Sequence, residues 1–156
     1  MNDQLRLDGN VLIKAYKHGA LWHVERVKNL VVTTGRDVVR DLILNFGNAP
    51  NCLAVGKGTS TTTAGMTALE TEHFRKYFTR RTSGGGRATY QTLLTTSEGN
   101  VTPPDTLREA GLFVGAGFNG AALAVGGTLF ARTTFTPIAK DNTITITFTW
   151  DITITS

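Results

Sequence analysis

Cysteine is almost absent from this chain of 156 residues: Cys52 stands alone, so no disulfide can form within one chain. No apolar run approaches the ~20 residues that a membrane-spanning helix needs. The first ten residues, MNDQLRLDGN, lack the hydrophobic region of a signal peptide. We therefore expect no membrane association and no secretion by that route.

Charge is also scarce, at 18% of residues, and the net charge of +4 does not by itself indicate a nucleic-acid-binding protein. The three histidines, His18, His23 and His73, have no cysteine or carboxylate at the spacing of metal ligands. Cys52 has no evident partner base, and no G-x-S-x-G motif is present. We predict no catalytic, cofactor-binding or metal-binding residue, and hence no enzyme.

A glycine-rich segment at residues 56–65, GKGTSTTTAG, superficially resembles a phosphate-binding loop. The phosphate-binding pattern requires a lysine directly after its second glycine, whereas Lys57 precedes that glycine here. We interpret the segment as an ordinary surface loop.

What the chain does contain favours β structure. It has 17 glycines, many threonines and 40% hydrophobic residues, enough for one core in one domain spanning residues 1–156. A β-hairpin is predicted at about 10–28, with its turn near His18 and Gly19. We predict a mostly β (α+β) fold, an antiparallel β-sandwich or partly closed barrel with one main helix.

That helix is predicted at 34–46, with Thr34 as N-cap and Asp37 in a capping box. Its apolar side chains recur at helical spacing and are expected to face the core: Val38, Val39, Leu42, Ile43 and Phe46.

The C-terminal segment TITITFTWDITITS alternates strictly between apolar and polar residues, which predicts one long strand. The residues expected to point into the core are Ile144, Ile146, Phe148, Trp150, Ile152 and Ile154. The opposite face carries a single charge, Asp151, where a solvent-facing edge strand would normally carry several. We therefore predict that Thr145, Thr147 and Thr149 bind a neighbouring subunit or protein; simple β propensity of threonine is the alternative.

Two further groups of charged residues attract attention. Glu72, Arg75, Arg108 and Glu109 combine opposite charges beside apolar strand residues, and we predict that they form one structural ion-pair cluster. Residues 75–87 are basic and contain no acid, and Arg80, Arg81 and Arg87 are predicted to bind a partner. An acidic protein surface and a nucleic acid remain alternatives for that partner, although we favour protein because the rest of the chain is not strongly basic.

The order of several segments carries a resemblance: NLVVTTGRDVVRDLIL, LAVGKGTSTTTAGMTALETEHFR, LREAGLF and GGTLFARTTFTPIAKDNTITITFTW. The chain resembles small virion proteins of tailed bacteriophages over residues 29–156, and especially the N-terminal module of tail-collar fibre proteins. The matching positions are Thr34, Gly35, Ala54, Gly56, Gly58, Thr67, Leu69, Glu72, Arg75, residues 108–113 and Lys140.

The resemblance implies a structural protein of the virion, assembled in the bacterial cytoplasm. Its partners would be other virion proteins and further copies of itself, with no cofactor. A fibre protein continues into a long shaft, whereas this sequence ends after the module. We therefore expect an attachment module of the tail, collar or baseplate-fibre region, with capsid decoration as the alternative.

Overall fold

The computed structural model describes residues 6–115 and 126–155, which form nine strands and one helix. Their bounds in chain order are β1 Arg6–Lys17, β2 Ala20–Val31, α1 Thr33–Ile43, β3 Pro50–Gly56, β4 Glu72–Tyr77, β5 Arg80–Gly84, β6 Arg87–Leu94, β7 Leu107–Val114, β8 Thr128–Ile138 and β9 Ile144–Thr155. The protein is mostly β, as predicted.

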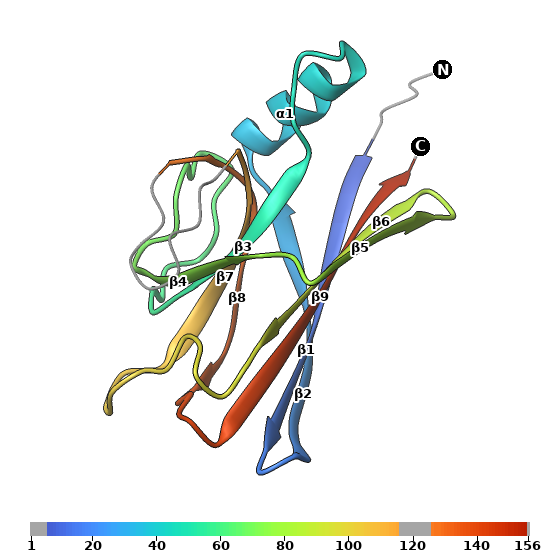
Figure 1. Ribbon diagram of the computed structural model, residues 1–156. Coiled ribbons are helices and arrows are strands. Elements are labelled where there is room, and N and C mark those ends of the chain that lie inside the picture. The colour runs from blue at the N-terminus through green and yellow to red at the C-terminus, as the bar shows by residue number, and fades with distance from the viewer. Residues whose placement is uncertain (1–5, 116–125, 156) are drawn as a thin grey trace.

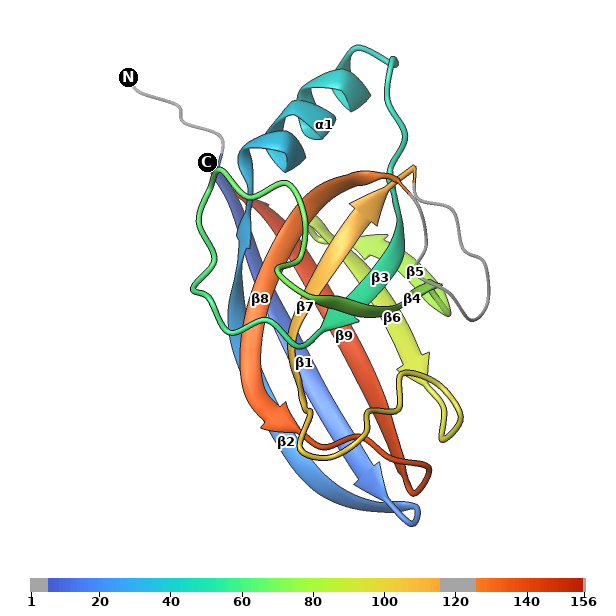
Figure 2. The same ribbon diagram turned by 90° about the vertical axis from the view of Figure 1, so that its left-hand side faces the viewer.

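The strands form one curled antiparallel sheet in the order β4-β3-β7-β8-β2-β1-β9-β6-β5 (Figures 1 and 2). Its two halves join at two places. β2 pairs with β8 only at Leu30 and Val31, and Phe78 and Thr79 form a corner that leads from β4 to β5. The sheet therefore curls into a partly closed barrel around one main core, and the predicted fold class is confirmed.

The alternation of β9 places its large apolar residues inside the curled sheet. Ile144, Ile146, Phe148, Trp150 and Ile152 are buried, as predicted. The prediction is wrong for Ile154, which is half exposed. This residue pairs with Leu7 near the end of β9 and the start of β1, and among the described residues it lines a surface hollow beside the β5–β6 turn, where its N–H donates to the carbonyl of Gly86.

The N-terminal hairpin is longer than predicted, since β1 and β2 each contain 12 residues. Its turn lies where expected, at His18 and Gly19, which both have positive φ angles of 50° and 80°. Two positive φ values are typical of the tight turns that match strand twist in hairpins.

The helix differs from its prediction at both ends. It begins at Thr33 after the N-cap Val32, and the Thr34 hydroxyl instead donates a hydrogen bond to the carbonyl of Leu129. It ends at Ile43, which leaves Phe46 outside it.

The predicted apolar stripe of this helix is only partly buried. Val38 is buried and Val39 packs against the core, but the prediction is wrong for Leu42, Ile43 and Phe46, which are exposed. The helix packs on β8, and its C-terminal half projects beyond the end of the sheet (Figures 1 and 2).

Candidate partner-binding surfaces

The curled sheet has two outer faces that differ in what lies over them. On the outer face of β4, β3, β7 and β8, residues 57–71 pack as a loop through Met66 and Leu69, forming a small second core with Cys52, Ala54 and Phe113. We call this the covered face. The outer face of β5, β6, β9, β1 and β2 has no such loop over it in the described part of the chain, and we call it the open face.

Glu109 is the centre of the covered face. Its Oε1 accepts hydrogen bonds from the backbone N–H groups of Gly58 and Thr71 at 2.9 and 2.8 Å. Its Oε2 accepts from the N–H of Glu70 at 3.0 Å and from Nε of Arg132 at 2.9 Å. Glu109 and Arg132 are both fully buried. This one carboxylate therefore attaches the loop to the sheet at three backbone positions.

Two neighbouring groups extend the attachment. Arg132 donates through Nη1 to the carbonyl of Ser60 and the hydroxyl of Thr62, both at 2.9 Å. The carboxylate of Glu70 accepts from the N–H groups of Ser60 and Thr59 at 2.7 Å, and these bonds, that from Ser60 first, hold the pKa of Glu70 below its usual value.

Glu72 and Arg75 form a separate pair on the same face. The Arg75 guanidinium donates two bonds to the Glu72 carboxylate at 2.8 and 2.7 Å and lies 3.9 Å from the centre of the Phe113 ring. The predicted four-membered cluster needs correction, because Arg108 donates to the Thr106 hydroxyl and the ion-pair partner of Glu109 is Arg132. Arg132 was missed because it lies 23 residues from Glu109 and meets it only through the pairing of β7 with β8.

The open face brings together most of the residues predicted to bind a partner. Thr145, Thr147 and Thr149 lie along β9, half exposed, between β1 and β6. Arg80, Gln91 and Thr149 line a shallow hollow of about 240 Å³, together with Thr82 and Thr89. Arg87 lies on the same face, 3.6 Å from the carboxylate of Asp151.

Arg81 is separated from this group. It lies with Tyr90 and Ala88 around a different hollow, and Tyr90 packs against the main core. The aromatic rings of Phe78 and Tyr90 pack on each other with centroids 4.8 Å apart. Burial also raises the pKa of Tyr90. These rings are therefore not a free stacking surface.

The missing charge on β9 has a structural explanation. β9 pairs with β1 along 12 residues and with β6 along eight, so it is a central strand whose backbone groups are already bonded. Charged side chains that discourage strand addition belong on edge strands. On the open face the basic side chains stand on the surrounding strands, at Lys14, Arg26, Lys28, Arg80 and Arg87, and the acids are Asp8 on β1 and Asp151 on β9 itself.

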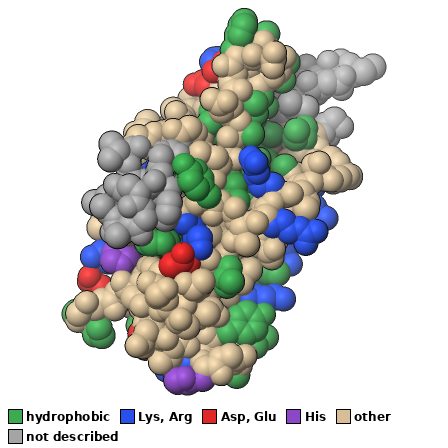
Figure 3. Space-filling model, in the orientation of Figure 1, with side chains coloured by type: hydrophobic (Ala, Val, Ile, Leu, Met, Phe, Trp, Pro, Cys, Tyr) green, Lys and Arg blue, Asp and Glu red, His purple; other side chains and the backbone are tan. Residues whose placement is uncertain are grey.

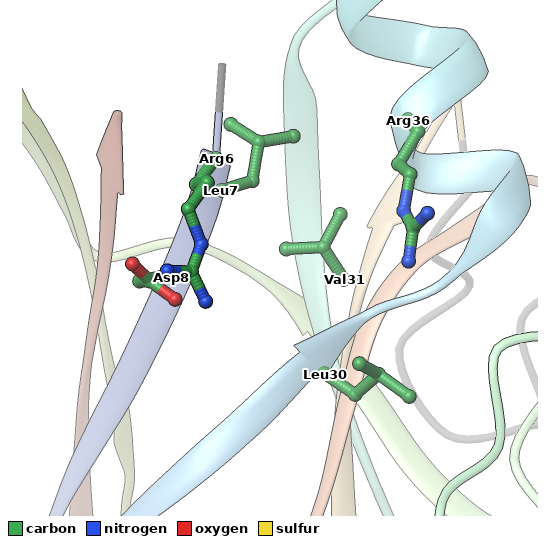
Figure 4. Close-up of a pocket in the computed structure, with 6 residues that line it drawn as sticks. All are labelled: Arg6, Leu7, Asp8, Leu30, Val31 and Arg36. Carbon is green, nitrogen blue, oxygen red and sulfur yellow. The ribbon is translucent and has the colours of Figure 1, made fainter. Parts of the chain in front are cut away.

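A cavity of about 290 Å³ lies between the start of β1, the end of β2 and the first turn of α1. Figure 4 shows Arg36 reaching from α1 toward Val31 and Leu30, while Arg6, Leu7 and Asp8 come from β1. In the described part of the chain neither Arg6 nor Arg36 has a carboxylate within ion-pair distance. The lining therefore combines two arginines with one carboxylate, Asp8.

Lys140 is a fully buried lysine whose partners are neutral oxygens. Its ammonium group donates to Oδ1 of Asn100 at 2.7 Å and to the carbonyl of Asp141 at 3.2 Å. Burial lowers the pKa of Lys140 to about 8, and nearby carboxylates of Asp141 and Glu98 oppose that shift. Together with the Val101 N–H bond to the Lys140 carbonyl, this side chain fixes the loop before β7 to the turn before β9.

Three further kinds of site could carry a function: a metal site, a membrane-spanning helix or a reactive cysteine. Within residues 6–115 and 126–155, no three His, Cys, Asp or Glu side chains are placed to hold a metal ion. In the same ranges no helix has the length and apolar character to cross a bilayer. Burial raises the pKa of the Cys52 thiol, which favours the unreactive protonated form.

Comparison with known proteins gave no match: no family model fits the chain, and no significant similarity to a curated protein or a solved structure was found.

Proposed function

We propose that this chain is a non-enzymatic structural protein of a tailed-bacteriophage virion, an attachment module of the tail, collar or baseplate-fibre region. The observation that carries the proposal is the open face. Five strands present a broad surface with threonines at its centre and Lys or Arg side chains around them. A surface with so little charge at its centre can pack against another protein without burying unpaired ions.

The charged residues of the sequence resemblance support a structural role. Glu109 attaches the loop to the sheet, and Glu72 and Arg75 pair with each other along β4 while Arg75 also donates to the carbonyl of Gly126. Removal of Glu109 would loosen the loop of the covered face.

The basic residues favour a protein partner over a nucleic acid. Arg81 lies apart from Arg80 and Arg87, and Arg87 already has Asp151 nearby. Nucleic-acid grooves combine continuous positive charge with exposed aromatic rings, and Phe78 and Tyr90 pack on each other instead. Acidic or neutral residues of another virion protein fit this surface better.

Quantitative mass spectrometry of gradient-purified virions from the phage that encodes this chain tests the proposal. Isotope-labelled peptides of this chain and of the major capsid protein would give copies per particle. We expect a few to tens of copies, resistant to high-salt washing. Hundreds of copies would indicate capsid decoration instead, and absence from the particle would refute the virion role altogether.

A further inference from the structure

Of the ten large apolar side chains that are exposed in the described residues, seven gather at two places. The first is the projecting end of α1 and the residues after it, Leu42, Ile43, Leu44 and Phe46, whose exposed fractions range from 39% to 84%. We call these four residues the helix end. Leu42 and Ile43 continue the helical stripe that begins with the buried Val38, and Leu44 and Phe46 follow the helix where it extends past the sheet.

The second place is the tip of the β1–β2 hairpin, where Leu21, Trp22 and Val24 are between 51% and 56% exposed. We call these three residues the hairpin end. The pairing of β1 with β2 shifts between Ala15 and Tyr16, so Trp22 has no direct partner in the ladder and lies beside the turn. The Lys17 ammonium lies 6.0 Å from its ring centre.

The two ends lie far apart. Figures 1 and 2 both place α1 at the upper end of the molecule and the β1–β2 turn at the lower end. Figure 3 shows exposed hydrophobic side chains toward both ends of the molecule. A contact between two copies that covers one end of each kind therefore joins the helix end of one copy to the hairpin end of the other.

The helix end carries an excess of negative charge, and the hairpin end offers it one exposed lysine. At the helix end, Arg40 is shared between the carboxylates of Asp37 and Asp41, which leaves an excess of negative charge. The carbonyls that finish the helix add partial negative charge. At the hairpin end the charge is mixed: Lys17 lies beside Trp22, Glu25 keeps its negative charge while it accepts hydrogen bonds from Thr136 on β8, and Asp141 is close enough to Lys17 for the two charges to attract each other.

We propose that copies of this chain associate head to tail, the helix end of one copy binding the hairpin end of the next. A helix-to-helix contact would bring Asp37 and Asp41 near their own copies and leave the hairpin end uncovered. A head-to-tail contact avoids both problems, and repeated around an axis it forms a ring, or a filament when the rotation does not close. This association does not depend on the virion role.

The amount of apolar surface fits such a contact. The seven side chains together expose roughly 800 Å² of apolar surface, taking large side chains at about 150–250 Å² each. A standard interface buries about 1,600 Å² in total, of which somewhat more than half is non-polar. The two ends therefore supply most of the apolar area that one interface needs.

The test uses Phe46→Asp and Trp22→Asp, each of which inactivates one end and leaves the other intact. Sedimentation velocity and native mass spectrometry would follow the wild type and each variant between about 5 and 200 µM. We expect concentration-dependent oligomers for the wild type, and self-association weakened at least about tenfold in either variant, since central aromatic residues dominate interfaces. An equimolar mixture should form a one-to-one dimer and stop there, because only one intact helix end and one intact hairpin end remain.

Ala68→Asp, at an exposed position in the loop of the covered face and outside both ends, is the control and should assemble like the wild type. Circular dichroism and urea unfolding would verify that each variant is folded. If Phe46→Asp or Trp22→Asp does not fold, Ile43→Asp and Leu21→Asp provide a second pair of variants. Any one of three outcomes would overturn the proposal: the wild type stays monomeric, the mixture fails to dimerise, or one variant assembles normally. None of these outcomes would change the number of copies per virion, which tests the virion role separately.

Discussion

The covered face and the open face are built from equally regular antiparallel strands, yet they differ in where charge is placed. The covered face buries Glu109, Arg132 and Arg75 almost completely. The open face keeps half-exposed threonines along its central strand and leaves its basic side chains on the surrounding strands.

The difference follows from the backbone. Residues 57–71 are not part of a ladder, so their N–H groups need acceptors when they pack on the sheet. Glu109 and Glu70 supply those acceptors, and Arg132 balances the charge of Glu109. On the open face the strands already bond to each other, so side chains have no backbone to satisfy. Buried charge in this protein therefore marks an irregular segment that must be attached.

The largest effect is expected for Glu109→Gln on the covered face. The amide can no longer accept hydrogen bonds through both of its former oxygens, and Arg132 stays buried without its countercharge. Breaking such a pair from one side costs about 3–5 kcal/mol. Urea unfolding should show this loss in the free energy of unfolding.

Asp151→Asn is the matched replacement on the open face. Asp151 accepts a bond from the Thr89 hydroxyl and lies near an exposed Arg87, so its loss should cost less than about 1 kcal/mol. Equal losses in the two variants would contradict the distinction between the faces.

An intermediate effect on stability is expected from Lys140. Its buried ammonium group donates hydrogen bonds only to neutral oxygens. Its pKa is about 8 in the folded protein, against an ordinary value of 10.5. Between these values the unfolded chain binds more protons than the folded one, so stability rises with pH. Relative to Lys140→Met, the free energy of unfolding of the wild type should increase by about 1–3 kcal/mol from pH 7.5 to 10.5.

Taking the difference from Lys140→Met cancels groups common to both proteins, including Tyr90. A flat difference over this pH range would show that the Lys140 ammonium is not destabilised by burial.

The smallest effect on stability is expected from Thr147→Lys on the open face. The new ammonium would face Lys14 on β1, and like charges opposite each other cost only about 0.2–1 kcal/mol. If the open face binds a partner, however, incorporation into particles should fall sharply while the isolated protein stays folded.

Thr102→Lys, in an exposed loop position away from this face, serves as control and should incorporate normally. Normal incorporation of Thr147→Lys would remove the threonines from the binding surface.

Local patterns in the sequence were enough to predict several of these features. The alternation of β9 correctly identified five buried residues, because period-two spacing decides which face is apolar. Glu72 and Arg75, three residues apart, do pair with each other. In contrast, Glu109 and Arg132 depend on the register between two strands, which no local pattern contains.

The helix shows the same limit. Its stripe from Val38 to Phe46 indicates a surface that avoids water, but it does not indicate what covers that surface. Only the first half meets the sheet. Likewise, the threonines of β9 suggested a shielded strand. The strand needs few charges because β1 and β6 pair with it on either side. Binding of a partner to the threonines stays a prediction.

The course of the long strands has a mechanical consequence. β2 leads directly from the hairpin tip to α1, and it is bonded to β1, which is bonded in turn to β9. Hydrogen bonds in antiparallel pairs run perpendicular to the strands. A pull between the two ends of the molecule would run along the already extended backbone of β2, so the load is carried by covalent bonds and no ladder has to open. The protein should resist stretching along this axis far better than peeling at the short β5–β6 edge.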